Sequence, residues 1–152
     1  MKIWAWTMLF CLAMSLPAQA KVKVIDGDSL MVNGTEVRLE GIDAPEYHQE
    51  CFDKDNQAYP CGQRAYEALL AFAGQDTVCE QTTVDRYHRS VAICSSGGKV
   101  INEQMVLSGW AVAYTHYNDA FAEAEKKARR DKRGIWQGRF MKPELYRALM
   151  RK

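Results

Sequence analysis

The sequence predicts a small α+β barrel, in which short curled strands are covered by packed helices. Short apolar or β-branched runs separated by turn residues indicate the strands, at residues 22–25, 29–32 and 36–39. Apolar residues at helical spacing indicate the helices, at residues 62–73, 101–107 and 121–133. A chain of 152 residues, 47% of them hydrophobic, has room for one ordinary domain. This composition excludes a disordered, collagen-like or multi-pass membrane protein.

The three strand-like runs form an antiparallel meander in this interpretation. Asp26-Gly27-Asp28 separates the first run from the second, and Asn33-Gly34, a strong two-residue hairpin signal, joins the second to the third. Each helix then ends at a glycine, in order Gly74, Gly109 and Gly134. Pro143 is placed to open a last short helix.

Residues 1–20 are typical of a cleaved secretory signal peptide. A lysine follows Met1, an almost wholly apolar run of 14 residues comes next, and the segment ends in the small-x-small pattern of a signal peptidase site. An uncleaved anchor helix is the alternative, but the apolar run is shorter than the roughly 20 residues that span a bilayer. We therefore expect a mature domain of residues 21–152, secreted or periplasmic and without stable membrane association.

Four cysteines remain in that domain, and their even number predicts two disulfides in an oxidising compartment. Residues 77–79 and 90–94 are strand-like and flank a hairpin that we expect to turn about Arg86-Tyr87. In that register Cys79 lies opposite Cys94, which favours the pair Cys79–Cys94 and, by elimination, Cys51–Cys61. A zinc site built from these thiols and nearby histidines is the alternative, and the lack of a close Cys-x-x-Cys pair argues against it.

Charge is divided unevenly along the chain. The formal net charge of +1 does not by itself indicate a polyanionic ligand. However, residues 21–120 hold 8 basic and 15 acidic residues, whereas residues 121–152 hold 11 basic and 4 acidic residues. A basic helical tail is commonly a solvated helix face, and an acid-rich segment can gather carboxylates around a metal ion.

Chemically active side chains gather in three short motifs. These are Val24-Ile25-Asp26-Gly27-Asp28-Ser29, Val37-Arg38-Leu39-Glu40-Gly41-Ile42-Asp43-Ala44-Pro45-Glu46 and Asp85-Arg86-Tyr87-His88-Arg89. Taken singly, each is typical of an ordinary polar turn. Taken together, carboxylates suited to a hard cation and arginines suited to an oxyanion predict a phosphodiester site.

These motifs, followed by Gly134-Ile135-Trp136, resemble in order and spacing those of staphylococcal nuclease and its thermonuclease-like relatives. The resemblance covers residues 22–136, and the four cysteines are similar to those of the secreted bacterial branch. It implies an α+β fold, an OB-fold five-stranded β-barrel with about three packed helices. It also implies a monomeric, Ca²⁺-dependent nuclease that acts on DNA and RNA, prefers single strands and leaves 3′-phosphate ends.

The resemblance further implies a role for each matched residue. Asp28, Asp43 and the backbone carbonyl of Ala44 would bind Ca²⁺. Glu46 would be the general base that activates a water molecule. Arg38 and Arg89 would hold the phosphate oxygens and stabilise the transition state.

Substrate-binding roles follow for three more residues in the same way. Arg86 and Tyr87 would contact a neighbouring terminal phosphate. Tyr114 would stack on a base, with Tyr117 as the alternative, because residues 109–114 are one residue shorter than in the namesake. His88 stands where the family has glycine, a position suited to positive φ.

A catalytically silent OB-fold that only binds nucleic acid is the alternative function. Such a module would have lost the acidic and arginine set. The complete set Asp28, Arg38, Asp43, Glu46 and Arg89 favours the enzyme.

Overall fold

The computed structural model describes residues 19–114 and 119–150. Its main sheet has the strand order β1-β2-β3-β8-β7, with β9 paired to β8, and only β3 and β8 run parallel. The strands are β1 (Val22–Val24), β2 (Ser29–Val32), β3 (Thr35–Leu39), β7 (Val78–Val84), β8 (Ser90–Ser96) and β9 (Lys99–Val100). The predicted meander is confirmed, and Asn33 and Gly34 both have positive φ, 52° and 86°, as a two-residue hairpin turn requires. The predicted signal peptide lies outside the described residues, except for its last two positions.

Two short strand pairs lie outside the main sheet. One joins β4 (Ile42–Asp43) to β10 (Val112–Ala113), and the other joins β5 (Cys51–Phe52) to β6 (Ala58–Tyr59). The first pair matters for the site because Asp43 is its last β4 residue, paired with Val112.

Four α-helices and one 3₁₀ helix complete the described fold, one α-helix more than the three expected to pack. They are α1 (Cys61–Phe72), α2 (Ile101–Leu107), α3 (Ala122–Arg130), η1 (Gly134–Gln137) and α4 (Pro143–Met150). The predicted starts and ends of α1 and α2 hold within one residue, and α4 begins at Pro143 as expected. By contrast, α3 ends three residues early, because the chain turns at Lys132 with a positive φ of 52°.

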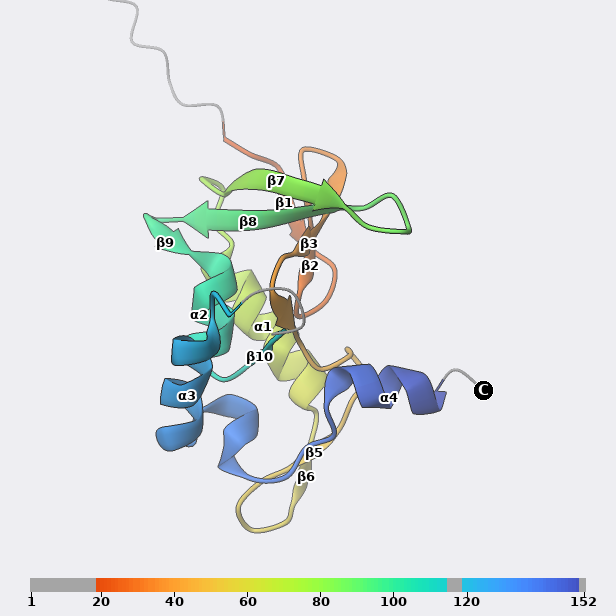
Figure 1. Ribbon diagram of the computed structural model, residues 1–152, viewed down its shortest axis with the longest axis vertical. Coiled ribbons are helices and arrows are strands. Elements are labelled where there is room, and N and C mark those ends of the chain that lie inside the picture. The colour runs from red at the N-terminus through yellow and green to blue at the C-terminus, as the bar shows by residue number, and fades with distance from the viewer. Residues whose placement is uncertain (1–18, 115–118, 151–152) are drawn as a thin grey trace, which may run out of the picture.

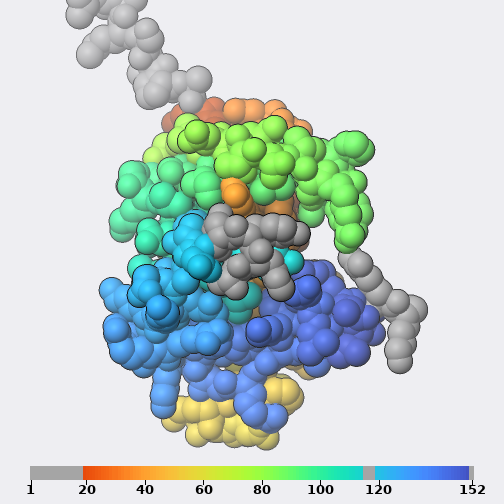
Figure 2. Space-filling model, in the orientation of Figure 1, coloured from red at the N-terminus to blue at the C-terminus, as the bar shows by residue number. Residues whose placement is uncertain are grey.

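The sheet forms one half of the molecule and the helices the other (Figure 1). In the space-filling view the main sheet, in red, orange and green, lies above the blue helices α3 and α4, and the yellow segment with β5 and β6 lies below them (Figure 2). The core lies between these halves, where α1 and α2 cover the sheet, and its fully buried side chains include Leu30, Leu39, Leu69, Ile101 and Met105. Close packing of such residues fixes the strands relative to the helices. No helix in the described ranges is long and apolar enough to cross a bilayer.

Both predicted disulfides are present, and Cys79 lies opposite Cys94 as expected. The predicted turn, however, was wrong. The loop has three residues, because Asp85 and Arg89 close it through a 3.0 Å hydrogen bond from the Asp85 N–H to the Arg89 carbonyl. A bulge between Gln81 and Thr83 then shifts the register back by one residue. The two deviations cancel, so the predicted pair is correct although its turn was not.

His88 occupies the last position of this loop and has a φ of 64°. That value is in the left-handed region, which a three-residue hairpin loop needs at this position. The expectation of positive φ at His88 is therefore confirmed. With the cysteines paired in disulfides, the alternative zinc site built on their thiols is excluded.

Candidate active site

Asp28 lies at the inner end of the site and is 3% exposed. Gly27 precedes it at a point where a Cβ atom would lie 2.7 Å from the Cβ of Ala44 and 2.8 Å from the Cβ of Ala65. Only glycine allows this approach to α1, and the approach places the next side chain inside the molecule. There the Oδ2 atom of Asp28 accepts a 2.9 Å hydrogen bond from the Ala44 N–H.

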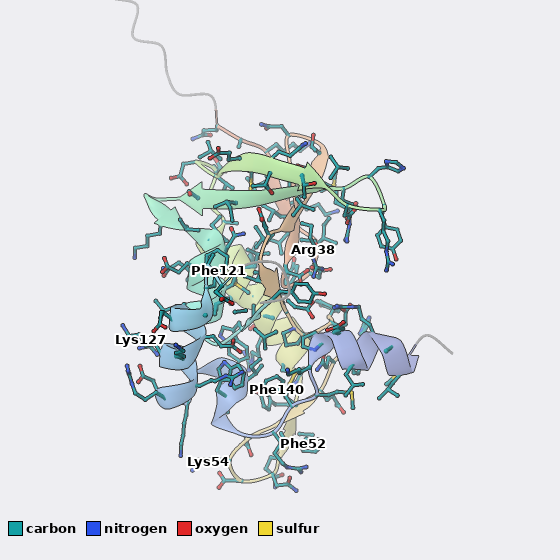
Figure 3. The ribbon with its side chains drawn as sticks, viewed as in Figure 1. Arg38, Phe52, Lys54, Phe121, Lys127 and Phe140 are labelled. Atoms are coloured by element: carbon teal, nitrogen blue, oxygen red, sulfur yellow. A yellow bond between two sulfur atoms is a disulfide. The ribbon has the colours of Figure 1, made fainter. Side chains whose placement is uncertain are left out.

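Arg38 joins the two buried aspartates. The β2–β3 register pairs it with Ser29, beside Asp28, and its Nη1 atom lies 2.6 Å from the Oδ1 atom of Asp28. Its Nη2 atom lies 3.1 Å from the Oδ1 atom of Asp43. Figure 3 shows Arg38 near the middle of the molecule, between the sheet and the helices. Three predicted residues from two separate motifs are therefore brought together.

Burial makes this cluster electrostatically unusual. Loss of solvent raises the pKa of Asp28 to about 7, with the nearby charges of Asp26 and Asp43 adding to the effect and Arg38 opposing it. Burial also disfavours the charge of Arg38, but Asp28 and Asp43 outweigh it and raise the pKa of the guanidinium. Arg38 thus stays charged, and one guanidinium does not fully compensate the three carboxylates around it.

Glu46 stands on a rigid turn beside this cluster, with its side chain 35% exposed. Pro45 is fully buried before it, and the buried Gln49 closes the turn, because the Gln49 N–H donates to the Glu46 carbonyl at 2.7 Å. The Oε1 atom of Gln49 also accepts a 3.2 Å bond from the Glu46 N–H. The turn lies directly on α1, since a Cβ atom on Gly62 would overlap the Glu46 carbonyl oxygen.

Arg147 of α4 is a site residue that the sequence did not indicate. Its Nη1 atom lies 2.8 Å from the Oδ1 atom of Asp43 and 2.7 Å from the Oε1 atom of Glu46. Its Nη2 atom donates to the Oδ2 atom of Asp43 at 3.2 Å. Burial disfavours its charge, but the hydrogen bonds to both carboxylates raise the pKa of its guanidinium. The only sequence signal was Pro143, which predicted the helix but not where the helix packs.

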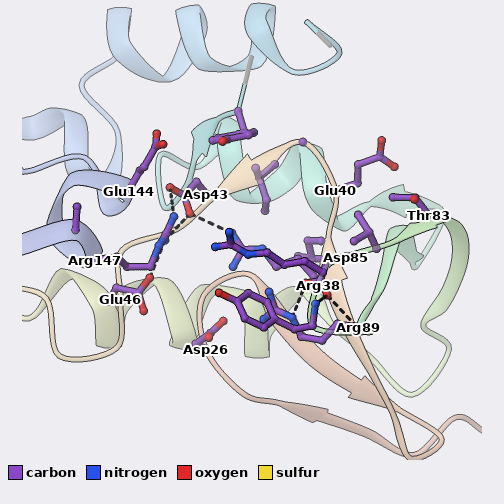
Figure 4. A pocket seen from close by; sticks show the side chains of 18 residues that line it. Asp26, Arg38, Glu40, Asp43, Glu46, Thr83, Asp85, Arg89, Glu144 and Arg147 are labelled. Atoms are coloured by element: carbon purple, nitrogen blue, oxygen red, sulfur yellow. Dashed lines mark hydrogen bonds and ion pairs between the residues drawn. The ribbon is translucent and has the colours of Figure 1, made fainter. Parts of the chain in front are cut away.

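An open cleft of about 1140 Å³ runs past these side chains, and Figure 4 shows the residues that line it. The predicted residues Arg38, Asp43, Glu46, Arg86, Tyr87, Arg89 and Tyr114 all line it. Asp28 lies behind this wall, in contact with Arg38. Tyr117, the alternative stacking residue, lies outside the described residues.

The β7–β8 hairpin supplies the opposite side of the cleft. The Nε atom of Arg89 lies 2.8 Å from the Oδ2 atom of Asp85, which orients its guanidinium. Arg86 and Arg89 both lie over the ring of Tyr87, with guanidinium carbons 4.9 and 5.7 Å from its centroid. Tyr87 is 57% exposed, so this cationic and aromatic tip faces the cleft without closing it.

The carboxylates at the inner end of the site fit a hard divalent cation. Asp28 and Asp43 converge within the span of one guanidinium, and carboxylate oxygens are the donors that Ca²⁺ and Mg²⁺ prefer. The described part of the chain gathers no group of three or more His, Cys, Asp or Glu side chains suited to a metal. A metal here would therefore also need the Ala44 carbonyl and water molecules as ligands.

Among the basic residues of the tail, residues 121–152, some lie on α3 and one lies on α4. The basic residues of α3 are exposed, and Figure 3 labels one of them, Lys127, on that helix. Within the described part of the tail, α4 brings the positive charge of Arg147 to the centre of the site. Buried carboxylates and arginines that converge on one cleft, on a small curled sheet, define the class of sites that hold phosphate groups with a metal ion.

Comparison with known proteins assigns the chain to a family. Residues 36–138 match the family described as "Staphylococcal nuclease homologue", so the protein belongs to this family, whose domain is an OB-fold. The expected fold and the expected resemblance are both confirmed. Helix α4 lies beyond the matched residues.

Individual relatives agree with this assignment. The chain is 36% identical to the "Micrococcal nuclease" of Shigella flexneri, over 82% of this chain and 79% of the relative. It is 38% identical to the "Succinoglycan biosynthesis protein ExoI" of Rhizobium meliloti, over 80% of this chain and 65% of the relative. It is 34% identical to the "Probable staphylococcal-like nuclease CAN1" of Oryza sativa subsp. japonica, over 72% of this chain and 31% of the relative. The chain thus spans about two thirds of the second of these proteins and under one third of the third.

Proposed function

We propose that this protein is a Ca²⁺-dependent nuclease that hydrolyses phosphodiester bonds of DNA and RNA and leaves 3′-phosphate ends. The observation that carries the proposal is the convergence of Asp28, Arg38 and Asp43, with Glu46 on the same cleft wall. Names of relatives, which include a micrococcal nuclease and an "Uncharacterized endonuclease" of Haemophilus influenzae, support a phosphodiesterase of this family.

The metal ligands in this proposal are Asp28, Asp43 and the Ala44 carbonyl. Held by these groups, Ca²⁺ would make a water molecule more acidic and would stabilise negative charge on the phosphate. The Asp28 carboxylate accepts a hydrogen bond from the Ala44 N–H, and this bond holds the backbone at Ala44 against the carboxylate. The ligand set is therefore ordered by the fold before a cation arrives.

Glu46 is the general base, and it takes a proton from water at a carboxylate oxygen that the cleft leaves accessible. Arg38 and Arg89 bind the non-bridging phosphate oxygens and stabilise the charge that develops in the transition state. Both are arginines on the wall of the cleft, so each presents a planar group of donors to the substrate.

Substrate contacts extend from the scissile phosphate in two directions. Arg86 and Tyr87 bind a neighbouring phosphate at the hairpin tip, and Tyr114 stacks on a base. Stacking requires an unpaired base, so we expect single strands to be cleaved faster than duplexes. The protein would act as a monomer.

A metal-dependence assay on two nucleic acids tests this proposal. Residues 21–152, purified and incubated with single-stranded DNA or RNA, should cleave both with Ca²⁺ and neither with a chelator. Glu46→Gln should lower kcat by about 10²–10⁴-fold. Glu67→Gln is the matched control, because Glu67 is an exposed carboxylate on α1 paired with Arg64.

Three outcomes of this assay would reject the proposal or part of it. Equal cleavage with and without metal would reject the calcium role, and an active Glu46→Gln variant would reject the base. Binding of uncut DNA in the presence of metal would instead fit the catalytically silent module.

We also propose that the protein acts outside the cytoplasm, in the periplasm or the medium, after removal of residues 1–20. The two disulfides support an oxidising compartment. Fractionation of expressing cells, with the amino terminus of the purified protein sequenced, would test both points. An amino terminus at Met1 would contradict the predicted cleavage.

A further inference from the structure

Arg147 joins two carboxylates to which the proposed function gives different tasks. It contacts both oxygens of Asp43, a proposed metal ligand, and Oε1 of Glu46, the proposed base. These contacts connect residues more than 100 positions apart in the sequence. Arg38 lies on the other side of Asp43, so two guanidinium groups share this one carboxylate.

Contacts outside the guanidinium also hold α4 against the Glu46 turn. Gln49 is completely buried, and its side chain reaches both segments. Its Oε1 accepts from the Glu46 N–H at 3.2 Å, and its Nε2 donates to the Met141 carbonyl at 2.7 Å, just before α4 begins. Breaking this pair would leave buried amide groups without partners, so the geometry is costly to disturb. The position of Arg147 is therefore built into the fold.

We propose that Arg147 is a positioning residue of the active site, which orients the Glu46 carboxylate toward the metal ligand Asp43. The inference rests on the proposed function and adds α4, which lies beyond residues 36–138, to the catalytic centre. Because the Glu46 side chain is 35% exposed, it has room to change rotamer, and the hydrogen bond from Arg147 restricts this freedom. Because the same guanidinium also donates hydrogen bonds to Asp43, it fixes the position of the proposed base relative to the proposed metal ligand.

This arrangement has two consequences of opposite sign. Without Arg147 the Glu46 carboxylate is free to rotate, so turnover should fall. At the same time Asp43 loses a cation that occupies both of its oxygens, so a metal ion should bind more tightly. Slower chemistry together with tighter metal binding is a combination that neither general damage to the site nor release of an inhibitory contact produces.

The experiment compares Arg147→Ala, Arg147→Lys and wild type in two assays. Metal affinity is measured without substrate, by calorimetry with Ca²⁺ and by luminescence of bound Tb³⁺. Kinetics on single-stranded DNA are measured at saturating Ca²⁺. For Arg147→Ala we expect about tenfold tighter metal binding, since a neighbouring unit charge is lost. We expect kcat to fall about 10- to 100-fold, as is usual when a partner that orients an active-site group is removed.

Arg147→Lys should recover part of kcat, because one ammonium can reach either carboxylate but does not span both. In a Glu46→Gln background, Arg147→Ala should cause almost no further loss, since its effect passes through Glu46. Arg64→Ala is the matched control. Arg64 is an exposed helical arginine with an ion pair to Glu67, and its loss should change neither assay.

Each other outcome overturns the inference. Higher kcat with tighter metal binding would make α4 an inhibitory element. Lower kcat with weaker metal binding would make Arg147 a purely structural support, and unchanged values would remove it from the site. An equal loss from Arg147→Ala with and without Glu46→Gln would show that it does not act through the base. Failure of the proposed function is separate, because wild type would then show no metal-dependent cleavage at all.

Discussion

Gly62→Ala is expected to inactivate this protein from a position outside the cleft. In most helices an alanine in place of glycine stabilises by about 1 kcal/mol. Here the added Cβ would lie 2.7 Å from the carbonyl carbons of both Glu46 and Tyr47, and would overlap the Glu46 carbonyl oxygen. Ordinary contact begins at 3.4 Å, so the turn that carries Glu46 must retreat.

The size of the effect follows from that displacement. A retreat of roughly 1 Å at a reacting group can cost about 10²-fold in rate. Overpacking costs about 1–3 kcal/mol, which the gain in helix propensity only partly offsets. We therefore expect kcat to fall about 100-fold while the free energy of unfolding falls by about 1–2 kcal/mol. Such a loss of stability leaves nearly all molecules folded, so it does not by itself explain the loss of rate.

Urea denaturation and initial rates on single-stranded DNA measure the two quantities. Ala71→Gly, an exposed substitution on the same helix, calibrates the propensity and should leave kcat unchanged. The reasoning is refuted if Gly62→Ala is both as stable and as active as wild type, since the backbone would then have room for the Cβ.

Three further predictions concern the cleft and the hairpin. Arg38→Lys and Arg89→Lys should each lower kcat by at least about tenfold, because lysine lacks the planar group of donors, and unchanged rates would contradict a two-pronged phosphate contact. Metal-free wild type should lose stability relative to Asp28→Asn between about pH 4 and 7, by up to about 4 kcal/mol in urea titrations. The sign follows because folded Asp28 keeps its proton to about pH 7, whereas unfolded Asp28 releases it near 3.8. If the stability of wild type relative to Asp28→Asn instead rose with pH in this range, the raised pKa of Asp28 would be excluded. Replacing both Cys79 and Cys94 by serine should cost about 3 kcal/mol of unfolding free energy for this 15-residue separation, with kcat retained, and an unchanged urea midpoint would contradict the estimate.

Local signals in the sequence account for most of the elements. Asn33-Gly34 predicts its hairpin because few residues accept two successive positive φ values, and both residues have them. Apolar spacing predicts α1 and α2 almost to the residue. In contrast, the β7–β8 turn was misplaced by one residue, because the three-residue loop and the bulge before Thr83 depend on pairing along the whole hairpin.

For the site, too, the sequence shows the residue types, whereas the fold decides how they come together. The motifs containing Asp28, Arg38, Asp43 and Glu46 are visible in the chain because their residue types suit a cation and a phosphate. Their convergence depends on the β2–β3 register and on the approach of Gly27 to α1, which no single motif contains.

The sequence by itself therefore determined the order of elements, the disulfide pairs and the residue types of the site. Only the tertiary structure decided which charges meet. The net charge of the chain is close to zero, yet burial raises the pKa of Asp28 to about 7. The packing of α4 places Arg147, a residue of the basic tail, against Asp43 and Glu46. The physical reason is that electrostatic interactions depend on distance and on exclusion of water, and both are properties of the packed molecule rather than of the order of its residues.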